Sequence, residues 1–154
     1  MNRIYKTTLA IALAALTTAS YAGIRANVTR TIRLSTWTAY TSDGALVWLN
    51  NNNDTLITFN LPAAGKKVLN YSAACAVLGP SYAYGDLDIY VNDLAVAPTA
   101  SAGAFCPGGS ISGTHTIILV IQGKLGLNTV QIVGRVVNGG NAFNINASSL
   151  VIHD

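Results

Sequence analysis

The chain has 154 residues, of which 51% are hydrophobic and 10% are charged, with nine Lys and Arg against six acidic residues. All six acidic residues are Asp, and the basic residues are scattered. The chain therefore lacks the concentrated positive surface that a nucleic-acid partner requires. The absence of Glu and the abundance of Val, Ile, Thr, Asn and Gly favour strands and turns over helices.

The first 22 residues have the three parts of a secretory signal peptide. Two basic residues begin it, residues 9–16 are apolar throughout, and Ala22 ends a cleavage site of small residues. The apolar run is far shorter than the ~20 residues that span a bilayer. We therefore expect residues 1–22 to be removed and residues 23–154 to form a single domain without a membrane anchor, secreted, periplasmic or at the cell surface. Removal leaves seven basic residues (nine minus two) against six acidic ones, a net charge of about +1.

The remaining sequence contains short strand candidates separated by clusters of Gly, Pro, Asn and Asp. In chain order, strands are expected over residues 29–35, 44–50, 56–61, 67–78, 86–92, 93–99, 114–124, 128–138 and 142–154. A short hairpin across Asn92 and Asp93 is expected to join residues 86–92 to residues 93–99. Eight or nine short strands without a convincing helix predict an all-β fold in which two antiparallel sheets form a sandwich of the jelly-roll type.

Two of these candidates show how the strand faces are used. In residues 67–78, alternation puts five side chains on one face: Leu69, Tyr71, Ala73, Cys75 and Val77. Residues 114–124 are apolar almost throughout, which is typical of a strand that is buried on both faces or borders the core. The two tryptophans, Trp37 and Trp48, are expected to fill the core.

Two cysteines follow the signal segment, Cys75 and Cys106. In an exported chain an even number of cysteines indicates an intramolecular disulfide. Closing a loop of this length contributes about 3 to 4 kcal/mol to stability in the chain-entropy model. A metal site would need further ligands nearby, and the only histidines are His115 and His153. We therefore expect a disulfide and no metal.

Three of the six Asp residues, Asp86, Asp88 and Asp93, occur in one short stretch. Alternation over this stretch puts apolar residues on one face and Asp86, Asp88, Tyr90 and Asn92 on the other. These polar side chains are expected on the solvent-exposed face of a strand. The alternative is a Ca²⁺ site, but Ca²⁺ takes about six to eight oxygen ligands, and alternation alone explains the polar positions.

Aromatic side chains surround the same strand. Tyr90 shares its expected exposed face, and Tyr84 precedes it. Sugar-binding modules use such rings as stacking platforms, while Asp and Asn side chains form hydrogen bonds with hydroxyl groups. The candidate ligand-binding residues are therefore Tyr84, Asp86, Asp88, Tyr90 and Asn92.

The sequence offers little for catalysis. It contains no Gly-x-Ser-x-Gly motif, and Ser110 and Ser112 precede His115 in a stretch that reads as a Gly-rich loop. Nothing in the sequence indicates the apolar pocket that the acid of a glycosidase pair requires. We expect no catalytic residues and no cofactor.

The motifs YSAACAV, DLDIYVNDLAVAPT, AFC, HTIILVI, NTVQIVGRVVN and SSLVIHD follow one another between residues 69 and 154. In this order the region resembles small, uncharacterised exported bacterial β-sandwich proteins, in which a Cys-bearing strand precedes an Asp-rich strand and a second Cys. The closing part is similar to jelly-roll domains of the carbohydrate-binding-module and C1q/TNF-like kinds, where an HT-x-x-L-x-I strand precedes a hairpin and a final S-L-x-I strand. The resemblance implies the sandwich fold and is silent on activity.

We therefore predict an exported, non-catalytic recognition module that binds an extracellular or cell-surface glycan, either alone or as a homo-oligomer. The alternative is a structural or adhesive subunit, fimbrial or matrix-like, that assembles through strand edges. In that case residues 23–31 would serve as an extended arm. A small hydrolase is a third hypothesis, and it requires a cleft that joins His115 to a carboxylate.

Overall fold

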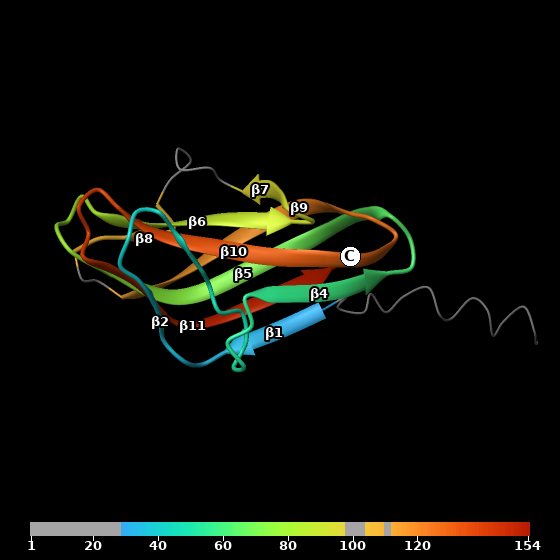
Figure 1. Cartoon of the computed structure of the whole chain (residues 1–154), viewed down its shortest axis with the longest axis horizontal. Helices are drawn as coiled ribbons and strands as arrows, with labels where there is room; N and C mark the ends of the chain where they lie inside the picture. The colour runs from blue at the N-terminus through green and yellow to red at the C-terminus, as the bar shows by residue number, and fades with distance from the viewer. Residues whose placement is uncertain (1–28, 98–103, 110–111) are drawn as a thin grey trace, which may run out of the picture.

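The computed structural model describes residues 29–97, 104–109 and 112–154, in which every regular element is a β-strand. Two antiparallel sheets pack face to face (Figure 1), which confirms the predicted all-β sandwich. The expected signal segment, residues 1–22, lies outside the described residues. Within the described ranges, no helix is long and apolar enough to cross a membrane.

The described residues form eleven strands rather than the expected eight or nine. They are β1 (Thr29–Arg33), β2 (Trp37–Ala39), β3 (Ala45–Leu46), β4 (Leu56–Leu61), β5 (Gly65–Leu78), β6 (Tyr84–Val91), β7 (Leu94–Ala97), β8 (Cys106–Pro107), β9 (Gly113–Gly123), β10 (Gly126–Val137) and β11 (Ala142–His153). The expected count was wrong because β2 and β8 have only three and two residues, and the expected strand 44–50 shortens to the two residues of β3. A strand this short shows no alternation that a sequence pattern can reveal.

The two sheets have different strand orders. Sheet A runs β1-β11-β5-β9, with β2 also paired to β11. Sheet B runs β3-β10-β6-β7, with β4 also paired to β10 and β8 to β6. The expected hairpin between β6 and β7 is confirmed, and both residues of its turn, Asn92 and Asp93, have positive φ (52° and 65°). A two-residue turn of this kind matches the twist of the strands that it joins.

The core lies between the sheets, and β5 contributes the face that alternation predicted. Its inner side chains are all buried: Leu69, Tyr71, Ala73, Cys75 and Val77. They belong to one apolar cluster with side chains from sheet B such as Leu87 and Ile132. Burial of one large apolar side chain stabilises a fold by roughly 1.5 to 3 kcal/mol, so this cluster is the main source of the fold's stability.

Trp37 fills the core as expected, and its ring occupies space left free by a glycine in the opposite sheet. Trp37 begins β2 in sheet A and is buried. A Cβ atom on Gly134 of β10 would lie only 2.5 Å from Cη2 of the Trp37 ring. Any side chain at this position would collide with the ring. Trp48 is only partly buried and packs against the edge of the same cluster.

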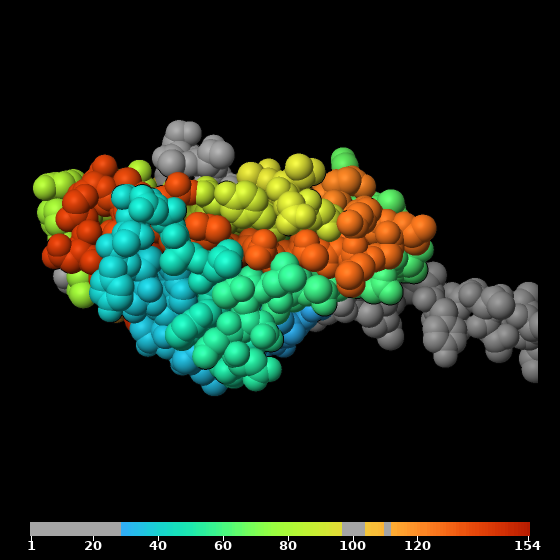
Figure 2. Space-filling view, viewed as in Figure 1, coloured from blue at the N-terminus to red at the C-terminus, as the bar shows by residue number. Residues whose placement is uncertain are grey.

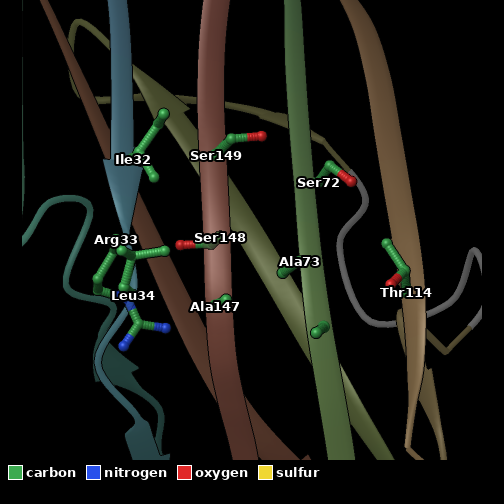
Figure 3. Close-up of a pocket in the computed structure, with 10 residues that line it drawn as sticks. Ile32, Arg33, Leu34, Ser72, Ala73, Thr114, Ala147, Ser148 and Ser149 are labelled. Atoms are coloured by element: carbon green, nitrogen blue, oxygen red, sulfur yellow. The ribbon is translucent and has the colours of Figure 1, made fainter.

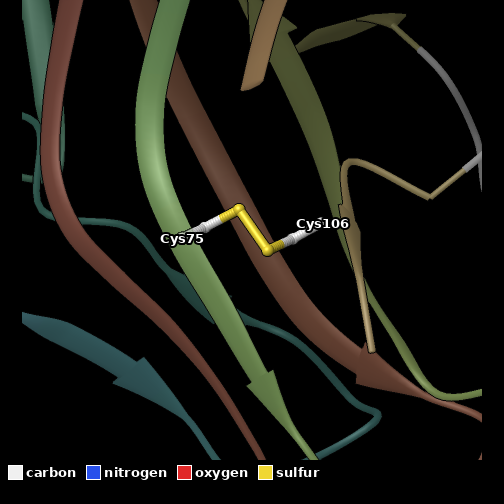
Figure 4. Close-up of a disulfide and its surroundings, with 2 residues drawn as sticks. All are labelled: Cys75 and Cys106. Atoms are coloured by element: carbon white, nitrogen blue, oxygen red, sulfur yellow. A yellow bond between two sulfur atoms is a disulfide. The ribbon is translucent and has the colours of Figure 1, made fainter. Parts of the chain in front are cut away.

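The predicted disulfide is present and joins the two sheets (Figure 4). Cys75 lies on β5 in sheet A, and Cys106 begins β8, which pairs with β6 in sheet B. The two Cα atoms are 6.1 Å apart, and both residues are fully buried. The bridge therefore links the sheets through the core.

β9 matches the second of its two expectations, because it borders the core on one face only. It borders the core through Ile117, Leu119 and Ile121, but the opposite face is open, with Ile118 and Val120 exposed by 65% and 68%. β9 is at the end of the strand order in sheet A, and no element of the described residues covers its outer face. The apolar run therefore reflects an exposed edge strand rather than burial on both sides.

Candidate binding site

Asp86 and Asp88 share one face of β6, but they are not solvent-exposed as predicted: they are 2% and 8% exposed. The neighbouring strand β10 places Arg135 directly opposite Asp86. The Arg135 guanidinium forms an ion pair with Asp88, and its Nε lies 3.5 Å from Oδ2 of Asp86. The expectation failed because Arg135, at least 47 positions away in the sequence, supplies a positive charge beside both carboxylates. This charge compensates for their burial.

One guanidinium serves both carboxylates, so the Asp86–Asp88–Arg135 cluster carries a net charge of −1. Oδ2 of Asp86 and Oδ1 of Asp88 are buried and accept no hydrogen bond from the part of the chain that the structure describes. Oδ2 of Asp86 has the ion pair with Arg135 as its one described polar contact. Buried acceptors that receive no hydrogen bond are costly.

The alternative Ca²⁺ site is not formed by the three Asp residues. Asp86 and Asp88 are paired with Arg135, and Asp93 is exposed in the turn that follows β6. Among the described residues, the one group of three potential metal ligands is Cys75, Cys106 and His115. Its two sulfur atoms are bonded to each other.

Asn92 serves the structure of the turn rather than an open surface. Its Nδ2 donates to Oδ1 of Asn128 (3.0 Å), and its Oδ1 accepts from the backbone N of Thr129 (3.1 Å). Asn128 is fully buried. Its Oδ1 also accepts a hydrogen bond from the backbone N of Lys124 (2.9 Å). Its Nδ2 donates to the carbonyls of Lys124 (2.9 Å) and Gly126 (2.8 Å). The two asparagines hold the β6–β7 turn against the β9–β10 turn.

Tyr84 and Tyr90 lie on the same face as the carboxylates and are both half-buried. They are six positions apart, so they lie ~20 Å from each other along β6. Tyr90 pairs with Gln131, whereas Tyr84 pairs with Val137 at the end of β10. Tyr84 is therefore the candidate that lies closest to the β10–β11 turn.

A hollow of about 490 Å³ opens at this end of the sandwich. One wall is the β2–β3 loop, residues 40–43, and the other is the end of β10 with its following turn, residues 136–140. Figure 2 shows the loop, in cyan, next to the red-orange turn. The side chains that line the hollow include Tyr40, Thr41, Ser42, Asp43 and Asn138.

Both walls of the hollow are anchored to β10. The carbonyl of Thr41 accepts a hydrogen bond from the backbone N of Val136 (3.2 Å), and β3 pairs with β10 just beyond the loop. The turn opposite contains Asn138 and Gly139, both with positive φ (57° and 73°). Asn and Gly tolerate this conformation best, which explains the sequence of the turn.

The hollow has the chemistry of a site for polar, uncharged ligands. It offers three hydroxyl groups, one carboxylate, one amide and the aromatic ring of Tyr40, which is 73% exposed. Among the described residues that line it, Asp43 is the one carboxylate and none is a histidine. Sequence patterns did not reveal this site, because its walls are almost 100 positions apart in the chain and neither carries a motif.

A second, shallow hollow of about 250 Å³ lies on the outer face of sheet A (Figure 3). Its floor consists of small side chains of β5 and β11, including Ser72, Ala147 and Ser149, and Ile32 forms one side. No aromatic ring is among its described lining residues. Without a stacking surface it is the weaker candidate for a sugar.

A buried polar group lies inside the sandwich, below the same strands. Arg33 is fully buried, its Nη2 donates to the carbonyl of Ile145 (2.7 Å) and its Nη1 to the carbonyl of Ser35. Tyr71 is close by, and burial raises the pKa of its hydroxyl to about 12, against smaller opposing effects of Ser148 and Arg33. Burial also lowers the pKa of Arg33, and the charge interaction with Tyr71 opposes this shift.

No protein-family model and no curated protein matches the sequence. Among solved structures, the fold is similar to a family 35 carbohydrate-binding module from Clostridium thermocellum (16% identity, 79% of this chain and 97% of the module covered, TM-score 0.42). It is also similar to a family 35 module from Paenibacillus barcinonensis (23% identity, 75% and 97% covered, TM-score 0.34). A third similar structure is an exo-β-1,3-galactanase from Phanerochaete chrysosporium (14% identity, 81% and 29% covered, TM-score 0.34). Likenesses this distant say nothing about a ligand, and the sandwich fold rests on the strand pairing described above.

Proposed function

We propose that the protein is an exported, non-catalytic module that binds a glycan in the hollow between the β2–β3 loop and the β10–β11 turn. The observation that carries this proposal is the composition of the hollow: an exposed tyrosine ring beside hydroxyl, carboxylate and amide groups. Sites for sugars combine a ring for stacking with a few polar groups that fix the hydroxyls. A volume of about 490 Å³ suits one sugar ring or a short segment of a chain.

Three of the lining side chains, Tyr40, Asp43 and Asn138, have a direct role in this proposal. The Tyr40 ring stacks on the apolar face of a sugar. The Asp43 carboxylate accepts hydrogen bonds from two neighbouring hydroxyls, and the Asn138 amide both donates and accepts. Tyr84 extends the site along β6, since its partner Val137 lines the hollow. Of the other residues predicted from the sequence, Asp86 and Asp88 are paired with Arg135 and do not line the hollow. Tyr90 and Asn92 lie toward the far end of β6.

Binding without hydrolysis and a location outside the cytoplasm are each supported by a separate observation. A glycosidase uses a pair of carboxyl groups across the scissile bond, and the described lining of the hollow provides only Asp43, so we assign binding without hydrolysis. The buried disulfide supports a location outside the cytoplasm, because disulfides persist in oxidising compartments.

A glycan array probed with the purified protein, with and without EDTA, tests the proposal. We expect selective binding that survives EDTA and that weakens at least about tenfold, or ~1.4 kcal/mol, in Tyr40→Ala and Asp43→Ala. Tyr82→Ala is the matched control, because Tyr82 is 70% exposed but does not line the hollow. Absence of binding to any glycan, or an equal loss in the control, would contradict the proposal.

A further inference from the structure

β9 is an edge strand without the features that normally protect an edge. It pairs with β5 over eleven consecutive positions with no bulge, from Gly65↔Gly123 to Cys75↔Gly113. No described strand pairs with its other side. Proteins usually protect such edges with Lys, Pro, inward-pointing charges or bulges. β9 contains no Pro and no Lys, Arg or Asp.

The side chains of β9 are also poorly covered. On the outer face, Ile118 and Val120 are each about two-thirds exposed. On the inner face, Ile117 and Leu119 contact the core but remain half-buried. The edge strand of sheet B on this side, β7, has only four residues and cannot cover the eleven of β9. Leu94 of β7 is itself 70% exposed, so both sheets present apolar side chains along this rim.

We propose that β9 pairs with β9 of a second copy of the chain, antiparallel about a two-fold axis at Ile118. The strand sequence is self-complementary in this register. Ile118 lies opposite itself, Thr116 opposite Val120 of the second copy, and Thr114 opposite Gln122. The first pair is apolar on both sides, the second joins two β-branched side chains of equal size, and the third is polar on both sides. Gly113 lies opposite Gly123, so the register uses the whole of β9.

In this arrangement the unpaired backbone N–H and C=O groups of β9 form hydrogen bonds with β9 of the second copy. The two copies of sheet A become one continuous sheet, and Ile117 and Leu119 gain cover from each other across the axis. An eleven-residue strand is ~35 Å long, and a rim two sheets thick is about 20 Å across. The contact is therefore of the order of the 800 Å² per partner that stable interfaces bury. β9 contributes no residue to the hollow, so dimerisation does not depend on the proposed function.

Light scattering after size exclusion and sedimentation velocity over a range of concentrations test the dimer. We expect a dimer of the native protein and a monomer of Ile118→Lys, which puts two like charges at the axis. Leu127→Lys is the matched control, since Leu127 is 60% exposed but lies on β10, and this variant is expected to remain dimeric. A native protein that stays monomeric, or a dimer that survives Ile118→Lys, would overturn the proposal.

Single cysteine variants test the register independently. Residues directly opposite on antiparallel strands have Cα atoms about 4.5 to 5.5 Å apart, within the range of a disulfide. Ile118→Cys should therefore form a covalent dimer on mild oxidation. Val120→Cys should not, because its counterpart lies four positions, or ~13 Å, along the strand. Equal cross-linking at both positions would contradict this register. A monomer in which the β9 amides that face away from β5 are protected from hydrogen exchange would mean that the chain covers its own edge, and would also overturn the proposal.

Discussion

The Arg135 guanidinium on β10 is ion-paired with the Asp88 carboxylate on β6, and both lie within one face of sheet B. The same guanidinium lies beside Asp86, so three charged groups are packed together with little solvent. Asp86 and Asp88, which were considered for a metal or sugar site from the sequence, are therefore engaged in ion pairs within the fold. The hollow that offers exposed polar groups lies at the adjoining end of the sandwich.

Replacing Arg135 should destabilise the fold strongly. Arg135→Met leaves two buried carboxylates without their counter-charge, and removal of one partner of a buried ion pair costs about 3 to 5 kcal/mol. Because Arg135 is partly exposed, we expect a loss near the lower end of this range in urea denaturation. Arg30→Met, at an exposed position of β1, is the control and should change stability by less than about 0.5 kcal/mol. Equal stability of the two variants would show that the cluster is not coupled to folding.

Removing the disulfide should also lower stability. The bridge spans 31 positions, and the chain-entropy model assigns about 3 to 4 kcal/mol to closing such a loop. The double variant Cys75→Ala/Cys106→Ala should therefore unfold at a clearly lower denaturant concentration than the oxidised native protein. The native protein under reducing conditions should approach the stability of the variant. A native protein insensitive to both treatments would be inconsistent with a structural bridge.

Asn128 should be sensitive to truncation because it satisfies backbone groups of two turns. Asn128→Ala removes the partners of the Lys124 amide and carbonyl and of Asn92. Buried polar groups left without partners cost about 1 to 3 kcal/mol, and we expect a loss of about 2 to 3 kcal/mol in thermal or urea unfolding. Asn60→Ala, at an exposed position of β4, should have little effect. Similar losses in both variants would argue against this role of Asn128.

Tyr71 should make stability depend on pH only in the alkaline range. Its pKa is raised from 10.0 to about 12 in the folded chain, so folding favours the neutral hydroxyl. This contribution is fully present below pH 10 and is lost as the pH rises through about 12, a difference of about 3 kcal/mol. Unfolding free energies of the native protein and Tyr71→Phe, measured from neutral to alkaline pH, should show the extra decline only in the native protein. Parallel curves for the two proteins would contradict the shift.

The sequence was informative wherever the signal is local. Alternation in residues 67–78 identified the buried face of β5, and the Asn92–Asp93 pair identified a two-residue hairpin, because strand period and turn conformation depend on adjacent residues. The cysteine count identified the bridge in the same way. These features needed no knowledge of which strands pair.

The remaining features depend on strand pairing, which a single sequence does not reveal. Alternation could place Asp86 and Asp88 on one face but could not show that β10 would put Arg135 against them. The apolar pattern of β9 could not distinguish a strand covered by neighbours from an edge strand. The hollow forms only when the loop at residues 40–43 meets the turn at residues 138–140.

Residue-resolved NMR can show whether a glycan binds in the hollow between these two loops. The oligosaccharide that binds best on the glycan array would be titrated into the isotope-labelled protein. We predict chemical-shift changes at the amides of Tyr40 to Asp43 and of Asn138 to Gly140, with little change at Tyr90 and Asn92. Changes concentrated at Tyr90 and Asn92, or no changes with any array ligand, would contradict the account.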